Sequence, residues 1–230
     1  MTQMKPENFF ALDLELNNKK DGTVPRVIEV GIAIGNPQDP ENIHPFNWYL
    51  DPQEPITEEI EKLTGISDAV IQSSAVSHEI CANELGGLIK VNNCFCNPIT
   101  WGGGDADELK TEFRDRDIHF PFFGRRILDV KTIYVFNQIV KGRTKAGGLR
   151  KSMASYGLDF VGTPHRASVD ALNTLRFFFH LLKQAFPTRL IPYPNQLRMV
   201  VIMMMMMMMM MMMMMVVVVV VVVVYVPPHV

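Results

Sequence analysis

The feature that most constrains the fold is an amphipathic segment at residues 9 to 16, FFALDLEL. Successive side chains of a β-strand point to opposite faces, so one face of this segment is apolar, with Phe10, Leu12, Leu14 and Leu16. The other face carries Asp13 and Glu15. Two carboxylates so close together repel each other unless a positive group lies between them. The segment therefore predicts a strand that either binds a divalent cation or has a solvated acidic face.

The order of the predicted elements indicates an α/β domain. Strands are expected at residues 26 to 34 and 47 to 50, joined to the first strand by short connections as in an antiparallel meander. Helices and short strands then alternate, and Thr163 and Pro164 are expected to open a long final helix. We predict a mixed central sheet with helices on both faces, in a single domain at residues 8 to 187.

The C-terminal tail, residues 188 to 230, contains thirteen consecutive methionines followed by nine consecutive valines. The apolar run from residue 200 to 226 exceeds the roughly 20 residues that a membrane-spanning helix needs. Either it anchors the protein with its body on the cytoplasmic side, or it is a homopolymer without structural function. We favour the second interpretation, because spanning segments normally mix residue types. We therefore expect a membrane partner only if the tail is an anchor.

The charged residues and cysteines narrow the function classes. The net charge of −2 does not by itself indicate a polyanion partner. Three cysteines are too few for a disulfide framework or a four-ligand zinc site, and the N-terminus lacks a secretory pattern; we expect a cytoplasmic protein. Residues 137 to 158 lack acids and form either a phosphate-binding flap or a solvated surface, with the basic side chains Lys141, Arg143, Lys145, Arg150 and Lys151.

Two further segments carry polar side chains that can join the first pair. Asp105 follows a predicted strand and three glycines, which permit a sharp turn at the edge of the sheet; Asp107 and Glu108 are alternatives there. His165 and Asp170 lie about 140° apart on an ideal helix. They converge only if His165 precedes the regular helix; otherwise they are a surface histidine and a helix-capping aspartate.

The three segments resemble, in this order, the motifs of the DEDDh branch of the 3′ to 5′ exonucleases, the group of the proofreading subunit of bacterial DNA polymerase and of ribonuclease T. The family's Asp-x-Glu motif is similar to FFALDLELN, its second motif to ITWGGGDADEL, and its His-x4-Asp motif to GTPHRASVDALNT. The stretch DPQEPITEEIEKLTGIS also looks like the family's sequence between the first two motifs. The resemblance covers residues 8 to 186 and implies a ribonuclease H-like fold.

The resemblance also implies two Mg²⁺ or Mn²⁺ ions and release of nucleoside 5′-monophosphates from the 3′ ends of single-stranded RNA or DNA. Asp13 is expected to bridge both ions, Glu15 and Asp170 to hold the ion nearer the nucleophile, and Asp105 to help hold the other. His165 is expected to be the general base. This chain departs from the family pattern in the residues that follow Glu15 and in its glycine run. Both departures bear on the contacts to the terminal base of the substrate more than on the metal site.

The sequence leaves the substrate contacts and partners open. The terminal base is expected to rest against apolar or aromatic side chains, for which Leu14, Leu16, Phe46 and Trp101 are candidates, although each of them is also compatible with the core. A polymerase or a second copy of the chain is a candidate partner. The alternative function is a catalytically idle module of the same fold that binds nucleic acid or assists a polymerase.

Overall fold

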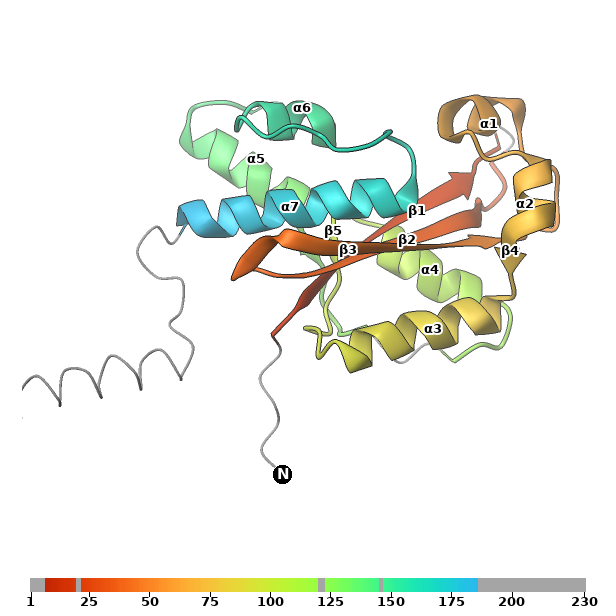
Figure 1. Ribbon diagram of the computed structural model, residues 1–230. Coiled ribbons are helices and arrows are strands. Elements are labelled where there is room, and N and C mark those ends of the chain that lie inside the picture. Colours follow the sequence, from red (N-terminus) through yellow and green to blue (C-terminus); the bar gives the residue numbers. More distant parts are fainter. Residues whose placement is uncertain (1–6, 20–21, 120–122, 145–146, 186–230) are drawn as a thin grey trace, which may run out of the picture. The chain divides into compact units, whose positions relative to one another are not determined.

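The computed structural model describes residues 7–19, 22–119, 123–144 and 147–185 (Figure 1). Six strands form one sheet in the order β4-β3-β2-β1-β5-β6. The first three are antiparallel neighbours, and the three short strands pair in parallel with the strands beside them. The strands are β1 (Phe9–Asn17), β2 (Arg26–Asn36), β3 (Asp39–Leu50), β4 (Ala75–Val76), β5 (Ile99–Thr100) and β6 (Leu128–Asp129).

Helices cover both faces of this mixed sheet, as the sequence predicts. One face packs against α3 (His78–Val91) and α4 (Asp105–Arg114), and the other against α5 (Val130–Val140), α6 (Leu149–Ala154) and α7 (Ala167–Ala185). Two short helices, α1 (Glu58–Thr64) and α2 (Asp68–Ser74), lie at one end of the sheet in Figure 1. The structure describes one compact unit that ends at Ala185.

Strand β1 has the two faces that its alternating sequence predicts. Phe10 and Leu12 are fully buried in the core beneath α3 and α4. On the other face Ala11 packs among residues of α7, whereas Asp13 and Glu15, further along the same face, are only half-buried. The strand is central in the sheet, so its acidic face meets a helix layer and is not a freely solvated surface.

The start of the last helix differs from the prediction. Helix α7 begins at Ala167, and Thr163 and Pro164 precede it as non-helical residues. The backbone N–H of Ala167 donates to the carboxylate of Glu29 on β2 (3.0 Å). The cap therefore comes from a strand far away in the sequence, which local cap preferences do not reveal.

The C-terminal tail and Lys145 lie outside the described residues, so the predictions made for them, and the domain boundary at 187, stay predictions. Among the residues that are described, no helix combines the length and the apolarity needed to cross a membrane.

Helix α7 lies very close to β2 because the strand presents small side chains to it. Gly31, Ala33 and Gly35 share the face of β2 that points toward α7. A Cβ atom at Gly31 would lie 2.0 Å from the carbonyl carbon of Ala167. A glycine is therefore required at position 31, because the two backbones approach closely. Since Asp13 is the partner of Gly31 on β1, the first turn of α7 lies against the sheet beside Asp13.

We predict that Gly31→Ala lowers the free energy of unfolding by at least about 2 kcal/mol, because the new methyl group overlaps the α7 backbone. Gly87→Ala is the matched control, since a Cβ there meets no atom within 4 Å and the residue lies inside α3. We expect this control to gain about 0.5–1 kcal/mol. Urea titrations of both variants measure the difference, and equal stability of Gly31→Ala and wild type would contradict the close approach.

Candidate active site

Four carboxylates and one imidazole come from separate parts of the chain. Asp13 and Glu15 lie on β1, Asp105 is the first residue of α4, and Asp170 lies in the first turn of α7. Strand β5, which leads to Asp105, runs parallel to β1 with Ala11 opposite Ile99. Because the carboxyl ends of parallel strands meet at one edge of a sheet, Asp105 follows its strand at the edge toward which β1 also runs.

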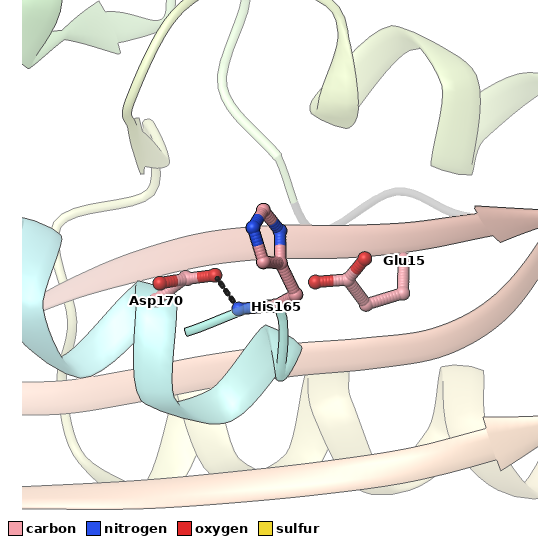
Figure 2. Close-up of side chains that lie close together, drawn as sticks. All are labelled: Glu15, His165 and Asp170. Carbon is pink, nitrogen blue, oxygen red and sulfur yellow. Dashed lines mark hydrogen bonds between the residues drawn. The ribbon is translucent and has the colours of Figure 1, made fainter. Parts of the chain in front are cut away.

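Glu15, His165 and Asp170 each offer one ligand atom, and these three atoms lie within 4.8 Å of one another (Figure 2). His165 precedes α7 in a left-handed conformation (φ 62°), and its backbone N–H donates to Asp170 Oδ2 at 2.9 Å. This irregular start brings the imidazole and the Asp170 carboxylate together despite their separation on an ideal helix. His165 therefore precedes the regular helix, which is the condition under which the sequence predicts that His165 and Asp170 converge.

The charges of the acids act on one another. Burial and then the charges of Asp105, Asp170 and Glu15 raise the pKa of Asp13 well above its usual range. Burial and the charges of Asp170 and Glu29 raise the pKa of Glu15 to about 8, although Arg166 opposes this rise. Burial raises the pKa of Asp105 to about 7, with help from Glu108 and Asp129, and burial raises that of Asp170. The acidic site therefore favours protons or cations.

Asp105 is the acid of α4 whose charge acts on the two acids of β1, Asp13 and Glu15. Its neighbours Asp107 and Glu108 are exposed. The preceding loop turns at Gly102 and Gly104, whose φ angles are 96° and 122°. An aromatic residue at Gly104 would be strained in this conformation.

Several residues around the acids were not predicted from the sequence. The fully buried Glu29 on β2 binds Arg166 and the N-terminus of α7. Asp129 accepts hydrogen bonds from the backbone of Gly102 and of Lys131, both at 2.9 Å, and so fixes the glycine loop. Glu29 had a usable signal, since it is a single acid within an otherwise apolar strand, RVIEVGIAIG.

The predicted substrate contacts have different environments. Leu14 is 8% exposed and lies in the core on the face opposite the acids, so we exclude it from the substrate contacts. Phe46 lines an open cavity between β3 and α3, with Trp48 and Glu84. Leu16 is half-buried, and so is Trp101, which packs against Tyr134 and Phe177. The remaining flap side chains are exposed: Lys141, Arg143, Arg150 and Lys151.

The fold is shared with solved nucleases. A full-length 3′-exonuclease superposes with a TM-score of 0.67 at 17% identity over 80% of this chain, which spans 63% of that protein's length. The nuclease domain of 3′hExo, a DEDDh family member bound to rAMP, gives 0.66 at 16% identity and covers 82% of this chain and 98% of its own. The cell-death related nuclease CRN-4 gives 0.65 at 19% identity, with 77% and 64% covered.

The similarity to these structures establishes the ribonuclease H-like exonuclease fold. No curated protein shows a significant sequence match to the chain. The family model described as exonuclease, RNase T, matches residues 10–178, which include every acid of the cluster and His165. The chain therefore belongs to the exonuclease (RNase T) family.

Proposed function

We propose that this nuclease is a metal-dependent 3′ to 5′ exonuclease that hydrolyses the terminal phosphodiester bond of single-stranded nucleic acid and releases nucleoside 5′-monophosphates. The observation that carries the proposal is the convergence of Glu15, His165 and Asp170 within 4.8 Å, beside two further carboxylates. Such a site offers both the ligands for divalent cations and a group that can take a proton.

The residues present fit divalent cations. Carboxylate oxygens are the ligands that Mg²⁺ and Mn²⁺ prefer, and the raised pKa values of Asp13, Glu15 and Asp105 mark a site that lacks compensating positive charge. We propose that these three residues and Asp170 hold two ions. When bound, the ions would stabilise the charge on the attacking and leaving oxygens.

The side chains of the protein supply the remaining steps. The exposed imidazole of His165 takes the proton of the attacking water as general base. Asp170 holds the backbone of His165 by the 2.9 Å hydrogen bond, so the imidazole stays beside the carboxylates. Half-buried Trp101 is the proposed contact for the terminal base, whereas Leu16 packs against the same core as Leu14.

Two features support a nucleic acid as the substrate: the ligands and targets of the solved relatives, and the exposed basic residues of the flap. The solved relatives include a 3′-exonuclease that recognises the 3′ end of a histone mRNA stem-loop and a nuclease domain bound to rAMP. We propose single-stranded RNA or DNA 3′ ends as substrates here. The exposed basic residues of the flap would contact the phosphates.

The central prediction concerns the full-length protein with 5′-labelled single-stranded RNA and DNA. With Mg²⁺ or Mn²⁺ we expect a ladder that shortens from the 3′ end, and none with chelator. Asp105→Asn should reduce activity to background, whereas Asp107→Asn, an exposed acid on the same helix, should leave it unchanged. Intact substrate under every condition would instead support a catalytically idle binding module.

His165→Ala should lower kcat by about 10²- to 10⁴-fold, the usual contribution of a general base. Metal affinity should change much less, because the four carboxylates remain. Calorimetric titration with Mn²⁺ and single-turnover rates at saturating metal separate the two effects. Full activity of the variant would exclude His165 as the base.

Stability should depend on pH in a direction set by the acids. The folded-state pKa values of Glu15 and Asp105, about 8 and about 7, lie above those of unfolded chains, so the metal-free folded state binds extra protons. The free energy of unfolding in chelator should therefore fall as pH rises from 5 to 8. Glu15→Gln should reduce this fall by at least about 1 kcal/mol, whereas the exposed control Glu41→Gln should not.

Divalent cations should reverse this loss of stability. We expect Mg²⁺ or Mn²⁺ to raise the melting temperature more at pH 8 than at pH 6, because protons compete with metal for the same carboxylates. Thermal unfolding at both pH values tests this expectation. An equal shift at the two pH values would argue against binding at these acids.

Substrate binding should weaken steeply with salt, because phosphate contacts release counterions. Removing three contacts with Arg143→Ala, Arg150→Ala and Lys151→Ala should reduce the slope of log K against log salt by about 2. Lys90→Ala, an exposed cation on α3 across the sheet, is the control. These binding measurements use Ca²⁺ or an inactive variant, and an unchanged slope would remove the flap from the binding site.

A further inference from the structure

We propose that Arg166, held by Glu29 and Tyr49, is a positioning residue that fixes His165 in the site. The inference rests on the proposed function, because it assigns a task to the histidine of that same site. Arg166 has no direct part in the proposed chemistry, since its guanidinium is bound to β2 and β3.

We call Arg166, Glu29 and Tyr49 together the clamp. Glu29 and Tyr49 belong to one row of side chains that crosses the sheet. Glu15 on β1 pairs with Glu29 on β2, and Glu29 pairs with Tyr49 on β3. Residues that are direct partners in neighbouring strands project from the same face. The row therefore begins at a proposed metal ligand and continues through a buried acid to a tyrosine.

Arg166 lies over this row and uses most of its donors there. Its Nη2 donates to Glu29 Oε1 at 3.1 Å and its Nε to Glu29 Oε2 at 3.3 Å. Nη2 also donates to the hydroxyl of Tyr49, and the guanidinium carbon lies 5.6 Å from the centre of that ring. A planar guanidinium held by two bonds to one carboxylate has a defined orientation, which a lysine cannot reproduce.

Glu29 is in turn stabilised by Arg166 and by the N-terminus of α7. Its side chain is fully buried, and an isolated buried carboxylate is strongly unfavourable. Arg166 supplies the opposite charge, and the backbone N–H of Ala167 donates a further hydrogen bond to Oε2. The same carboxylate thus binds the side chain of residue 166 and the backbone of residue 167.

His165 is held between two anchors. Its left-handed backbone conformation is unfavourable for a residue with a Cβ and persists only where the surroundings enforce it. Asp170 binds its N–H on one side, and on the other side the next residue in the chain is fixed to Glu29. Loosening the second anchor would release the imidazole from its place beside Glu15 without removing a metal ligand.

The test uses Arg166→Ala and chemical rescue. The side chain of Arg166 is 34% exposed, so added guanidinium can enter the space that the substitution leaves. We expect kcat to fall on the order of 10²-fold, as for a misplaced catalytic group, with the Mn²⁺ dissociation constant changed less than threefold. Guanidinium chloride at non-denaturing concentration should restore kcat at least fivefold.

Two variants make the result specific. Arg176→Ala removes an arginine within α7, the helix that follows Arg166, and should keep wild-type kcat; its guanidinium donates to the backbone carbonyl of Asp159 and to the side chain of Asn173. The double variant Glu29→Gln with Arg166→Ala should not respond to guanidinium, because the carboxylate that orients the cation is gone. Rescue of the double variant to the same degree would overturn the clamp.

Hydrogen exchange of the metal-free protein gives a readout that does not need activity. Arg166→Ala should accelerate exchange in residues 162 to 170, and guanidinium should slow it again, well below the melting temperature. If wild-type protein has no nuclease activity but exchange responds in this way, the clamp stands and the proposed function fails. Unchanged exchange, or a lower melting temperature with unchanged kcat, would reduce Arg166 to a structural residue.

Discussion

The contact on which the structure depends is the close approach of α7 to β2. Gly31 leaves no side chain between the strand and the backbone at Ala167, and Glu29, two residues earlier, caps the same helix end. Helix α7 can dock here because Gly31 has no side chain to separate it from the strand and because the buried carboxylate of Glu29 binds its N-terminus. Because Asp170 lies in the first turn of this helix, the docking also decides where the last acid of the site lies.

The site that this docking completes is electrostatically unfavourable without cations. Burial and mutual repulsion raise the pKa values of Asp13, Glu15, Asp105 and Asp170. Sites that perturb several acids in the same direction are typical of functional centres. The buried Glu112 behaves differently: burial acts to raise its pKa, but the hydrogen bond with His78 and the charges of Arg116 and Arg26 outweigh burial and lower it. The contrast indicates that the cluster of acids on β1, α4 and α7 favours the binding of cations.

The relatives show that this fold persists at low sequence identity. The solved nucleases share 16–19% of residues with this chain yet superpose with TM-scores of 0.65–0.67. A central strand whose two faces differ and a helix that docks on its neighbour need only small and apolar residues at the contacts, which many sequences provide. The acids of the cluster occur in three short motifs, Asp-x-Glu, the segment after the three glycines and His-x4-Asp, which is why they can be recognised in the sequence.

The sequence by itself determined the faces of β1, the mixed sheet and the order of the acidic motifs, because alternation and residue type are local properties. It also predicted Asp105 and the pair His165 and Asp170, but only as alternatives to surface roles. Only the tertiary structure decided that α7 begins at Ala167 and that Glu29 and Arg166 fix this start. The reason is that these bonds join residues 137 and 138 positions apart. No local propensity encodes contacts of that separation, which exist only once β2 and α7 have packed together.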